Sequence, residues 1–259
     1  MERAEDNVMD GIFNSDDLGE GYAQWRPPVH PHIVERMEKR VGHVARALDI
    51  GCGTGLSTRA LRPLADEAIG MEPFVAMLRW SGSIAPDASF VAGAAEAIPV
   101  RSKSMPLLTA AGSLNWADLE QFFPEARRVV TDDGVLVVYD FGQGRDLAGS
   151  DGLTRWNAQF KLRYPSPPCR AVNLETLSMN TPGFALREGE EFAVPIPIAP
   201  DFYLEYALTE TNVEAAIRNG TPKHEIRTWC EETLAPVFAG ETREVTFRGF
   251  IAYLSPEPR

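Results

Sequence analysis

The chain has 259 residues, enough for one large α/β domain with a sizeable core. Hydrophobic residues make up 44% and charged residues 24%, as in a globular protein, and no uninterrupted apolar run is long enough to cross a bilayer. The formal net charge of −12 repels phosphate backbones, so the composition argues against a nucleic-acid substrate.

The beginning of the chain is acidic and lacks the basic segment and apolar run of a secretory signal. Three cysteines, Cys52, Cys169 and Cys230, lie far apart, and their odd number argues against a disulfide framework and a zinc site. We therefore expect a cytoplasmic protein without a metal, with reduced thiols and no nucleic-acid or membrane partner. We expect it to be a monomer or a homodimer.

Residues 1–20 are polar, and we expect them to be loosely packed. Residues 21–32, GYAQWRPPVHPH, are rich in aromatic residues and proline, which predicts an irregular segment held by tertiary contacts. Ile33, Met37, Val41 and Val44 then recur at about every fourth residue. This spacing predicts an amphipathic helix packed on a sheet.

Residues 47–61, ALDIGCGTGLSTRAL, predict a strand, a glycine turn and a helix that runs to about Leu64. The turn carries alternating glycines at Gly51, Gly53 and Gly55. Glycine lets the backbone turn sharply and approach a ligand closely, while the amides that open a helix attract negative groups. The stretch therefore predicts a cofactor cradle.

The spacing of the glycines argues against a dinucleotide as the cofactor. A dinucleotide fingerprint, G-x-G-x-x-G, would place its third glycine at Leu56, where this chain has none. A second strand is expected to end at Glu72, 21 positions after Gly51, where an acidic residue of such folds accepts hydrogen bonds from ribose hydroxyls. A plain surface glutamate is the alternative.

The rest of the chain predicts further strands and helices. A third strand precedes residues 93–99, and residues 105–141 predict a fourth strand, a helix and a fifth strand. Residues 142–170 are too long for an ordinary connection and are typical of a lid or a binding loop. A helix and a sixth strand follow in residues 173–198, then helical segments broken at 220–222 and a closing strand over residues 244–254.

Four segments resemble class I S-adenosylmethionine-dependent methyltransferases. D-x-G-x-G-x-G at 49–55 resembles their first motif, and 93–99 resembles G-D-A-E-x-L-P with Ala94 in place of aspartate. Tyr22 and Arg26 resemble a Tyr-x-x-x-Arg-Pro segment of small-molecule methyltransferases. The type 11 and trans-aconitate methyltransferase-like group is matched at Trp116, Asp118, Phe122, Glu125 and Arg128, whereas Asn115 replaces its common histidine.

The resemblance covers about residues 22–141, and it implies a Rossmann-like fold. That fold has seven strands in the order 3-2-1-4-5-7-6, mostly parallel, with strand seven antiparallel. It implies one domain over residues 1–259, with a cofactor-binding core at 21–142 and substrate-lid insertions at 143–170 and 199–240. The activity implied is transfer of a methyl group from S-adenosyl-L-methionine to a small molecule by in-line displacement, which leaves S-adenosyl-L-homocysteine.

The cofactor-binding residues implied lie in the segments just described or beside them. They are Tyr22, Arg26, Asp49, Gly51, Gly53, Gly55, Glu72, Pro73, Met77, Ala94, Ala95, Glu96, Ala111, Gly112 and Trp116. Ligands of open α/β sheets lie beyond the carboxyl ends of the strands, here Ile50, Glu72, the loop after Val91, and residues 112–116 and 140–142.

The acceptor is expected beside the cofactor, in a pocket with aromatic walls. Its candidate residues are Trp25, His30, Trp116, Trp156, Phe160, Tyr164, Tyr203, Tyr206 and His224. Core packing is the alternative for the aromatic residues, and no catalytic base is assigned. Two other functions stay open, an NAD(P)-dependent oxidoreductase and a non-catalytic S-adenosylmethionine-binding protein, the latter because of Ala94 and Asn115.

Overall fold

The computed structural model describes residues 12–258, and the chain forms two compact units. The first, which we call the sheet unit, comprises His30–Phe141, Cys169–Phe192 and the residues from Gly249 onward. The second, the helical unit, comprises the chain up to Val29, Gly142–Pro168 and Ala193–Arg248. The predicted insertions at 143–170 and 199–240 lie almost wholly within the helical unit, and their role as a lid stays a prediction.

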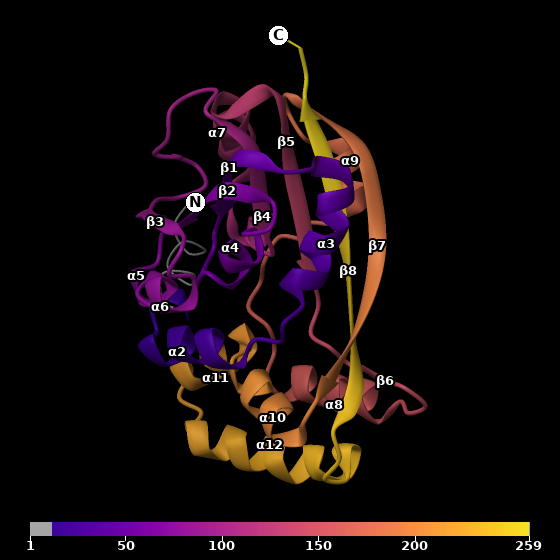
Figure 1. Cartoon of the computed structure of the whole chain (residues 1–259). Coiled ribbons are helices and arrows are strands. Elements are labelled where there is room, and N and C mark those ends of the chain that lie inside the picture. Colours follow the sequence, from indigo (N-terminus) through magenta and orange to yellow (C-terminus); the bar gives the residue numbers. More distant parts are fainter. Residues whose placement is uncertain (1–11, 259) are drawn as a thin grey trace. The chain divides into compact units, whose positions relative to one another are not determined.

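The strands form one mixed sheet in the order β3-β2-β1-β4-β5-β8-β6, and β7 pairs with β8 (Figure 1). The strands are β1 (Val44–Ile50), β2 (Ala65–Glu72), β3 (Ser89–Ala92), β4 (Met105–Ala111), β5 (Val130–Phe141), β6 (Asp146–Leu147), β7 (Phe184–Ile198) and β8 (Arg243–Pro256). Pairs among β1 to β5 are parallel, and β8 runs antiparallel to β5. The predicted fold class is confirmed, although the two-residue β6 is an addition to the predicted strands.

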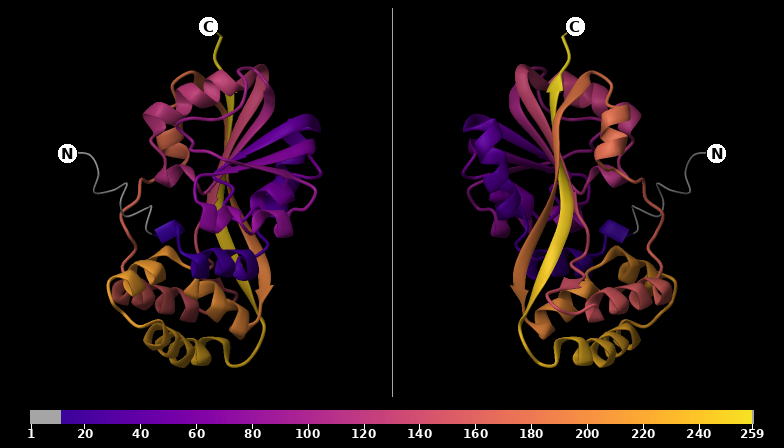
Figure 2. Two further views of the ribbon diagram at one scale, coloured as in Figure 1. Left: turned by 90° about the vertical axis from the view of Figure 1, so that its left-hand side faces the viewer. Right: turned by 90° about the vertical axis from the view of Figure 1, so that its right-hand side faces the viewer.

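Helices cover both faces of the strands in the sheet unit. They are α3 (His30–Val41), α4 (Leu56–Ala60), α5 (Val75–Leu78), α6 (Ser81–Ile84), the 3-10 turn η1 (Leu114–Trp116), α7 (Leu119–Val129) and α9 (Leu174–Met179). Figure 2 shows α7 and α9 on one face and α3 and α4 on the other. Phe122 and Phe123 of α7 are fully buried in a core with Leu48 and Leu108 of the central strands. This apolar core holds the carboxyl ends of β1, β2, β4 and β5 at one edge.

The helical unit has an aromatic core of its own. Its helices are α2 (Asp16–Trp25), α8 (Gly152–Arg163), α10 (Pro200–Leu208), α11 (Thr211–Arg218) and α12 (Lys223–Phe238). The Trp156 and Phe160 rings stack with centroids 4.8 Å apart, and Trp229 stacks on both. Such rings bury much apolar surface each, so they form the core of this unit.

The predictions for residues 16–25 and 30–32 were wrong, because the first form α2 and the second open α3, so neither stretch is loose or irregular. The Ser15 hydroxyl caps α2 by accepting from the Leu18 N–H, and Asp16 and Asp17 favour its first turn. A Cβ on Gly21 would lie 2.7 Å from Cγ2 of Thr209, so glycine here permits close packing on α10. The expectation for residues 1–11 lies outside the described residues.

Two helix boundaries also differ from the predictions. The helix after the glycine turn ends at Ala60 instead of near Leu64, and Val44 opens β1 instead of extending the preceding helix. Over residues 12–258 the structure has no helix that combines the length and the apolar character needed to cross a membrane. The cellular location stays a prediction.

Candidate functional site

The glycine turn after β1 uses conformations that side chains disfavour. Gly51, Gly53 and Gly55 have φ angles of 68°, 55° and 90°, in the left-handed region where glycine pays no steric penalty. A Cβ on Gly51 would lie 2.4 Å from Cβ of Ser113, so the turn also needs glycine for space. The N–H groups of Gly51 and Cys52 both donate to the Met71 carbonyl, at 2.8 and 3.0 Å, which fixes the turn against β2.

Asp49 fastens this turn from inside. Its carboxylate is fully buried and accepts hydrogen bonds from the hydroxyls of Ser57 (2.6 Å), Thr58 (2.8 Å) and Thr109 (2.9 Å). Burial raises the pKa of Asp49, although the three hydroxyls oppose that shift. Asp49 thus joins β1 to the first turn of α4 and to β4. Its role is to hold the cradle in shape.

Glu72 ends β2 and faces the same turn. Its Oε2 accepts from the Gly53 N–H at 2.9 Å, and its Oε1 accepts from the Phe74 N–H at 3.1 Å. The residue is only 5% exposed, and burial raises its pKa to about 7, with the charge of Asp49 adding to the shift. An ionised carboxylate has about four lone-pair positions, so two stay available to hydroxyl donors of a ligand.

These two carboxyl groups make the cradle negative where they are ionised, which for Glu72 is above about pH 7. Burial raises the pKa of both carboxyl groups, and hydroxyl donors at Asp49 and backbone donors at Glu72 lower it, while the charge of Asp49 raises the pKa of Glu72 further. Among residues 12–258, no lysine or arginine contributes to these pKa shifts. In a partly buried place, opposite charges attract more strongly than in water. The cradle therefore favours a positively charged ligand over a pyrophosphate.

The predicted adenine segment is a tight turn. Ala94 forms an isolated bridge with Ala97, whose N–H donates to the Ala94 carbonyl at 3.1 Å. Glu96 accepts from the Asp118 N–H at 2.7 Å and so connects this turn to the start of α7.

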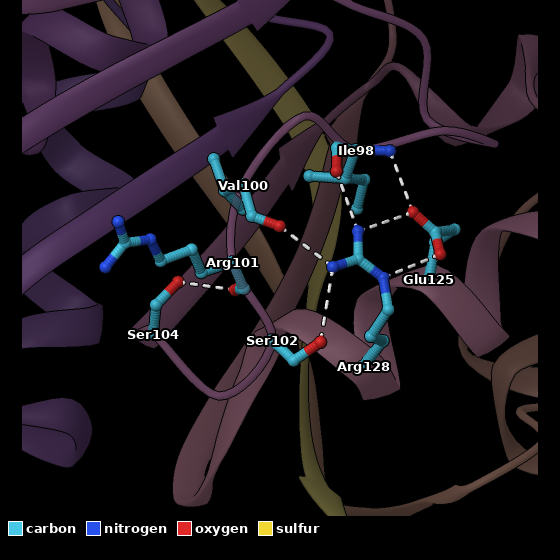
Figure 3. A network of polar contacts seen from close by, with 7 residues as sticks. All are labelled: Ile98, Val100, Arg101, Ser102, Ser104, Glu125 and Arg128. Carbon is cyan, nitrogen blue, oxygen red and sulfur yellow. Dashed lines mark hydrogen bonds and ion pairs between the residues drawn. The ribbon is translucent and has the colours of Figure 1, made fainter.

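Arg128 and Glu125 of α7 hold the chain that follows the turn (Figure 3). The Arg128 guanidinium donates to the carbonyls of Ile98 and Val100 at 2.7 and 2.8 Å, and Glu125 accepts from the Ile98 N–H at 2.9 Å. The two side chains also form an ion pair of 2.8 Å. Both motif residues therefore support the loop and do not themselves reach a ligand through these bonds.

At the ends of β4 and β5 a second carboxylate arrangement appears. Asp140 accepts from Asn115 Nδ2 through Oδ2 and from the Phe141 N–H through Oδ1, both at 2.7 Å. The Ser113 hydroxyl donates to the Ile50 carbonyl at 2.7 Å and so joins this edge to β1. Trp116 lies in η1 beside it and is partly buried.

His30, a predicted acceptor residue, contacts an unpredicted partner. Its Nδ1 lies 2.9 Å from the Tyr139 hydroxyl, and its ring packs edge-on to Phe141. Burial raises the pKa of Tyr139 well above its ordinary value, so the phenol keeps its proton at neutral pH.

Tyr22 and Arg26 lie in the helical unit. Arg26 forms an ion pair of 2.8 Å with Glu210 and donates to the Thr209 carbonyl at 3.3 Å. Its guanidinium carbon lies 3.8 Å from the centroid of the Tyr22 ring. These bonds hold the end of α2 on the α10–α11 connection, and a contact of Tyr22 or Arg26 with a cofactor stays a prediction.

Apart from Trp116, which lies in the sheet unit, the predicted aromatic acceptor residues also lie in the helical unit, and most are buried. Those exposed by 4% or less are Trp156, Phe160, Tyr164, Tyr203 and Tyr206. The Tyr203 hydroxyl donates to the Gly144 carbonyl at 2.6 Å, and Trp156 Nε1 donates to the Thr233 hydroxyl at 2.8 Å. These five buried side chains build the core of this unit. Trp25 packs edge-on to Phe202, and His224 is exposed on α12. Acceptor contacts stay predictions.

Sequence reasoning missed the hydroxyls around Asp49 and assigned no role to Tyr139, and it named Asp140 only as part of the strand end at residues 140–142. Asp140 carried a signal, because it is a carboxylate at the predicted carboxyl end of a strand, as Glu72 is. Thr109 carried none, since a threonine inside an apolar strand fits the strand pattern equally well.

Comparisons with known proteins agree with this geometry. Residues 48–138, from β1 to β5, match a family model described as methyltransferase domain. A putative methyltransferase of Dictyostelium discoideum is 26% identical over 135 residues, 52% of this chain and 50% of that protein. A probable S-adenosylmethionine-dependent methyltransferase of Saccharomyces cerevisiae is 28% identical over 170 residues, 59% of this chain and 57% of that protein. The chain spans about half the length of these curated relatives.

A solved structure extends the likeness in fold. The structure of a putative type II methyltransferase from Anaeromyxobacter dehalogenans superposes with a TM-score of 0.68 at 21% identity. The match covers 87% of this chain and 95% of that one. The fold is therefore that of class I methyltransferases, as the sequence predicted.

Proposed function

We propose that this chain, whose residues 48–138 form a methyltransferase domain, transfers a methyl group from S-adenosylmethionine to a small molecule. The observation that carries the proposal is the negative cradle formed by the glycine turn, Asp49 and Glu72. S-adenosylmethionine bears a sulfonium and an ammonium group and no phosphate, so its charge suits this place.

The cradle fits a nucleoside part as well. Glu72 has lone-pair positions for two ribose hydroxyls beside its bonds to the Gly53 and Phe74 N–H groups. Ala94 and Ala95 offer backbone groups and small side chains to an adenine. The trans-aconitate-like subgroup stays part of this proposal only as a prediction from the sequence.

When bound, S-adenosylmethionine supplies a methyl group on a positively charged sulfur, which is already a good leaving group. The residues of the chain then have to align the acceptor with the methyl group and need not activate the cofactor. Asp49 and its three hydroxyl donors hold the glycine turn rigid, and Glu72 fixes the ribose. Effective molarities of well-oriented groups correspond to roughly 7–11 kcal/mol of the barrier.

The dinucleotide alternative fits less well. The hydroxyls of Ser57 and Thr58, in the first turn of α4, are directed to Asp49 and so not to a phosphate. The third glycine of the dinucleotide fingerprint is replaced by Leu56, and a pyrophosphate would meet the negative charge of Glu72.

Calorimetry with S-adenosylmethionine, S-adenosylhomocysteine and NAD⁺ tests the proposal. We expect the first two to bind and NAD⁺ not to bind; binding of NAD⁺ alone would overturn it. Incubation with a metabolite library and an isotopically labelled methyl donor then separates an enzyme from a non-catalytic binding protein, because only an enzyme gives a labelled product.

A further inference from the structure

We propose that the helical unit holds a binding site for a small carboxylic acid, in a cavity at the ends of α8 and α11 where Arg163 receives the carboxylate. The ligand class is a monocarboxylate with a compact apolar body. The inference goes beyond the proposed function and does not depend on it. Every residue that lines the cavity belongs to the helical unit, whereas the residues of the cofactor cradle belong to the sheet unit.

The cavity has a volume of about 390 Å³, and small-molecule pockets occupy roughly 300–1,000 Å³. Its walls are the last residues of two helices and the residues that follow them. They include Arg163, Tyr164 and Pro165 at the end of α8, and Ala215 and Ala216 in α11. The volume lies near the lower end of the range and therefore suits a small metabolite.

The chain fixes the hollow between the two helix ends. Pro165 lacks the N–H that a further turn of α8 would need, and Asn212 Nδ2 at the beginning of α11 donates to the Tyr164 carbonyl at 2.8 Å. Asn212 and Tyr164 are both buried, so this bond ties the two helices together. Ala215 and Ala216, about one turn further along α11, bring only methyl groups to the wall. The space that larger side chains would fill therefore stays open.

Arg163 lines this cavity with a guanidinium that aromatic rings hold in place. Its Nε donates to the Tyr164 hydroxyl at 3.0 Å, and its guanidinium carbon lies 5.6 Å from the centroids of both the Tyr164 and the Trp229 rings. Such contacts hold an arginine without neutralising its charge. Within residues 12–258 no carboxylate forms an ion pair with Arg163, whereas Arg155 on the same helix pairs with Asp151 at 2.6 Å. The two Nη atoms carry four N–H groups that can bind a ligand.

The charges around the cavity favour a carboxylate over a phosphate. The charged residues of α11, Glu214 and Arg218, pair with each other at 3.6 Å, and residues 164–168 and 219–222 carry no charge. The end of α8 therefore provides the charge at the cavity, and that charge is positive. Both helices end here, and the partial negative charges of their carbonyl ends oppose a doubly charged phosphate more than a singly charged carboxylate. A guanidinium also matches both oxygens of a carboxylate with two parallel N–H bonds.

Neutral groups complete the wall. Asn219 and Thr221 line the α11 side, and their backbone N–H groups donate to the carbonyls of Ala215 and Ala216, at 3.0 Å each. These bonds hold the amide of Asn219 and the hydroxyl of Thr221 at the wall, where they can contact a second polar atom of the ligand. The ring of Pro165 and the alanine methyl groups offer apolar contact to its body.

A panel of small acids tests the site. It consists of benzoate, phenylacetate and isovalerate, each beside its neutral amide of nearly the same shape, together with phenyl phosphate. NMR titration of the whole chain measures the affinities. We expect at least one of the acids to bind with a Kd of about 1 mM or below. Its amide should bind about tenfold or more weakly, because the charge-assisted bonds to Arg163 are lost, and phenyl phosphate should bind more weakly than benzoate.

Variants locate the bound acid. Arg163→Gln should weaken the binding of the acid about tenfold or more and leave that of its amide within about twofold. Lys161→Gln is the matched control, because it removes the same charge from an exposed position of α8 that does not line the cavity. It should change the affinity for the acid by less than about twofold. Ala216→Leu keeps a good helix former in α11 but fills the cavity, so it should weaken acid and amide together.

Several outcomes would overturn the proposal. One is that none of the three acids binds at about 10 mM, and another is that the amides bind as tightly as the acids. Equal losses in Arg163→Gln and Lys161→Gln would show general attraction between charges instead of a site. An acid that S-adenosylhomocysteine displaces, and that Ala216→Leu binds as the wild type does, would lie in the cofactor cradle.

Isotopically labelled S-adenosylmethionine separates the two sources of such an acid. Label on the bound acid identifies it as the methyl acceptor, and binding without label identifies a ligand that is not methylated; the site stands in both cases. The proposed function fails separately. A chain that binds neither S-adenosylmethionine nor S-adenosylhomocysteine, but binds an acid that Arg163→Gln loses, would keep this site.

Discussion

The Gly53 N–H donates to Glu72 Oε2 over 2.9 Å and so joins the glycine turn after β1 to the end of β2. Glu72 therefore shapes the turn, and in the proposed function it also accepts hydrogen bonds from the ribose. Replacement of Glu72 should therefore change two measurable quantities, the affinity for the ligand and the free energy of unfolding.

We expect Glu72→Ala to weaken S-adenosylmethionine binding by about 1.5–3 kcal/mol, because hydrogen bonds to a charged group are lost. That loss corresponds to roughly a 10- to 150-fold increase in Kd, measurable by calorimetry. Glu67→Ala, on the exposed part of the same strand, is the control and should bind as the wild type does. An unchanged Kd in folded Glu72→Ala would remove Glu72 from the site.

Stability should depend on pH through Glu72. Its pKa is raised from 4.5 to about 7 in the folded chain, so between these values the folded state binds more protons than the unfolded state. The free energy of unfolding contributed by this group is then full below about pH 4.5 and falls as the pH rises toward 7, by a few kcal/mol. Asp49, whose pKa is also raised, acts in the same direction.

Glu72→Gln cannot ionise, so its free energy of unfolding should fall less between pH 5 and pH 8 than that of the wild type. Urea unfolding at both pH values measures the difference. The comparison is between the changes of the free energy of unfolding with pH. A loss of stability from the altered hydrogen bonds that is the same at both pH values does not affect it. Equal slopes for the two proteins would mean that Glu72 is already ionised at low pH.

The strands and the glycine turn were predictable because their signals are local. Apolar runs gave the strands, and alternating glycines followed by a helical run gave the turn. The partners of Asp49 were not predictable, since Thr109 lies 60 positions away and reaches Asp49 only because β1 pairs with β4. The same holds for Asn115 and Asp140, which are 25 positions apart and meet at the ends of two strands.

The error at α2 had a different cause. The prolines and aromatic residues of 21–32 suggested an irregular segment, and the helix signals before them, the Ser15 cap and the acidic pair Asp16 and Asp17, were not used. The prolines at 27 and 28 lie beyond the last residue of α2, Trp25, and so do not interrupt it. Gly21 breaks no helix here because close contact with Thr209 compensates for its cost.

Two glycines of the turn should respond differently to alanine. Gly53→Ala meets only Met77 Cε, at 3.4 Å, so its main cost is the left-handed φ, about 1–2 kcal/mol. Close to the ligand, the added methyl should reduce S-adenosylmethionine affinity by more than it reduces stability. Gly51→Ala meets Ser113 Cβ at 2.4 Å and should also lower the melting temperature clearly. If Gly53→Ala loses stability but keeps its affinity, the turn is structural only.

Trp156 and Trp116 separate packing from acceptor binding. Trp156 is 3% exposed and stacks on Phe160 and Trp229, so Trp156→Ala should cost about 3–5 kcal/mol of unfolding free energy through the cavity it leaves.

Trp116 is only partly buried, in η1 beside Asn115, and its replacement by alanine should cost far less stability. Trp116→Ala should instead raise the acceptor KM or lower kcat, with S-adenosylmethionine affinity changed by no more than a few-fold. Denaturation and calorimetry decide the first part, and steady-state kinetics decide the second once an acceptor is found. A Trp156→Ala protein that is fully stable yet poor in acceptor turnover would return Trp156 to the binding pocket.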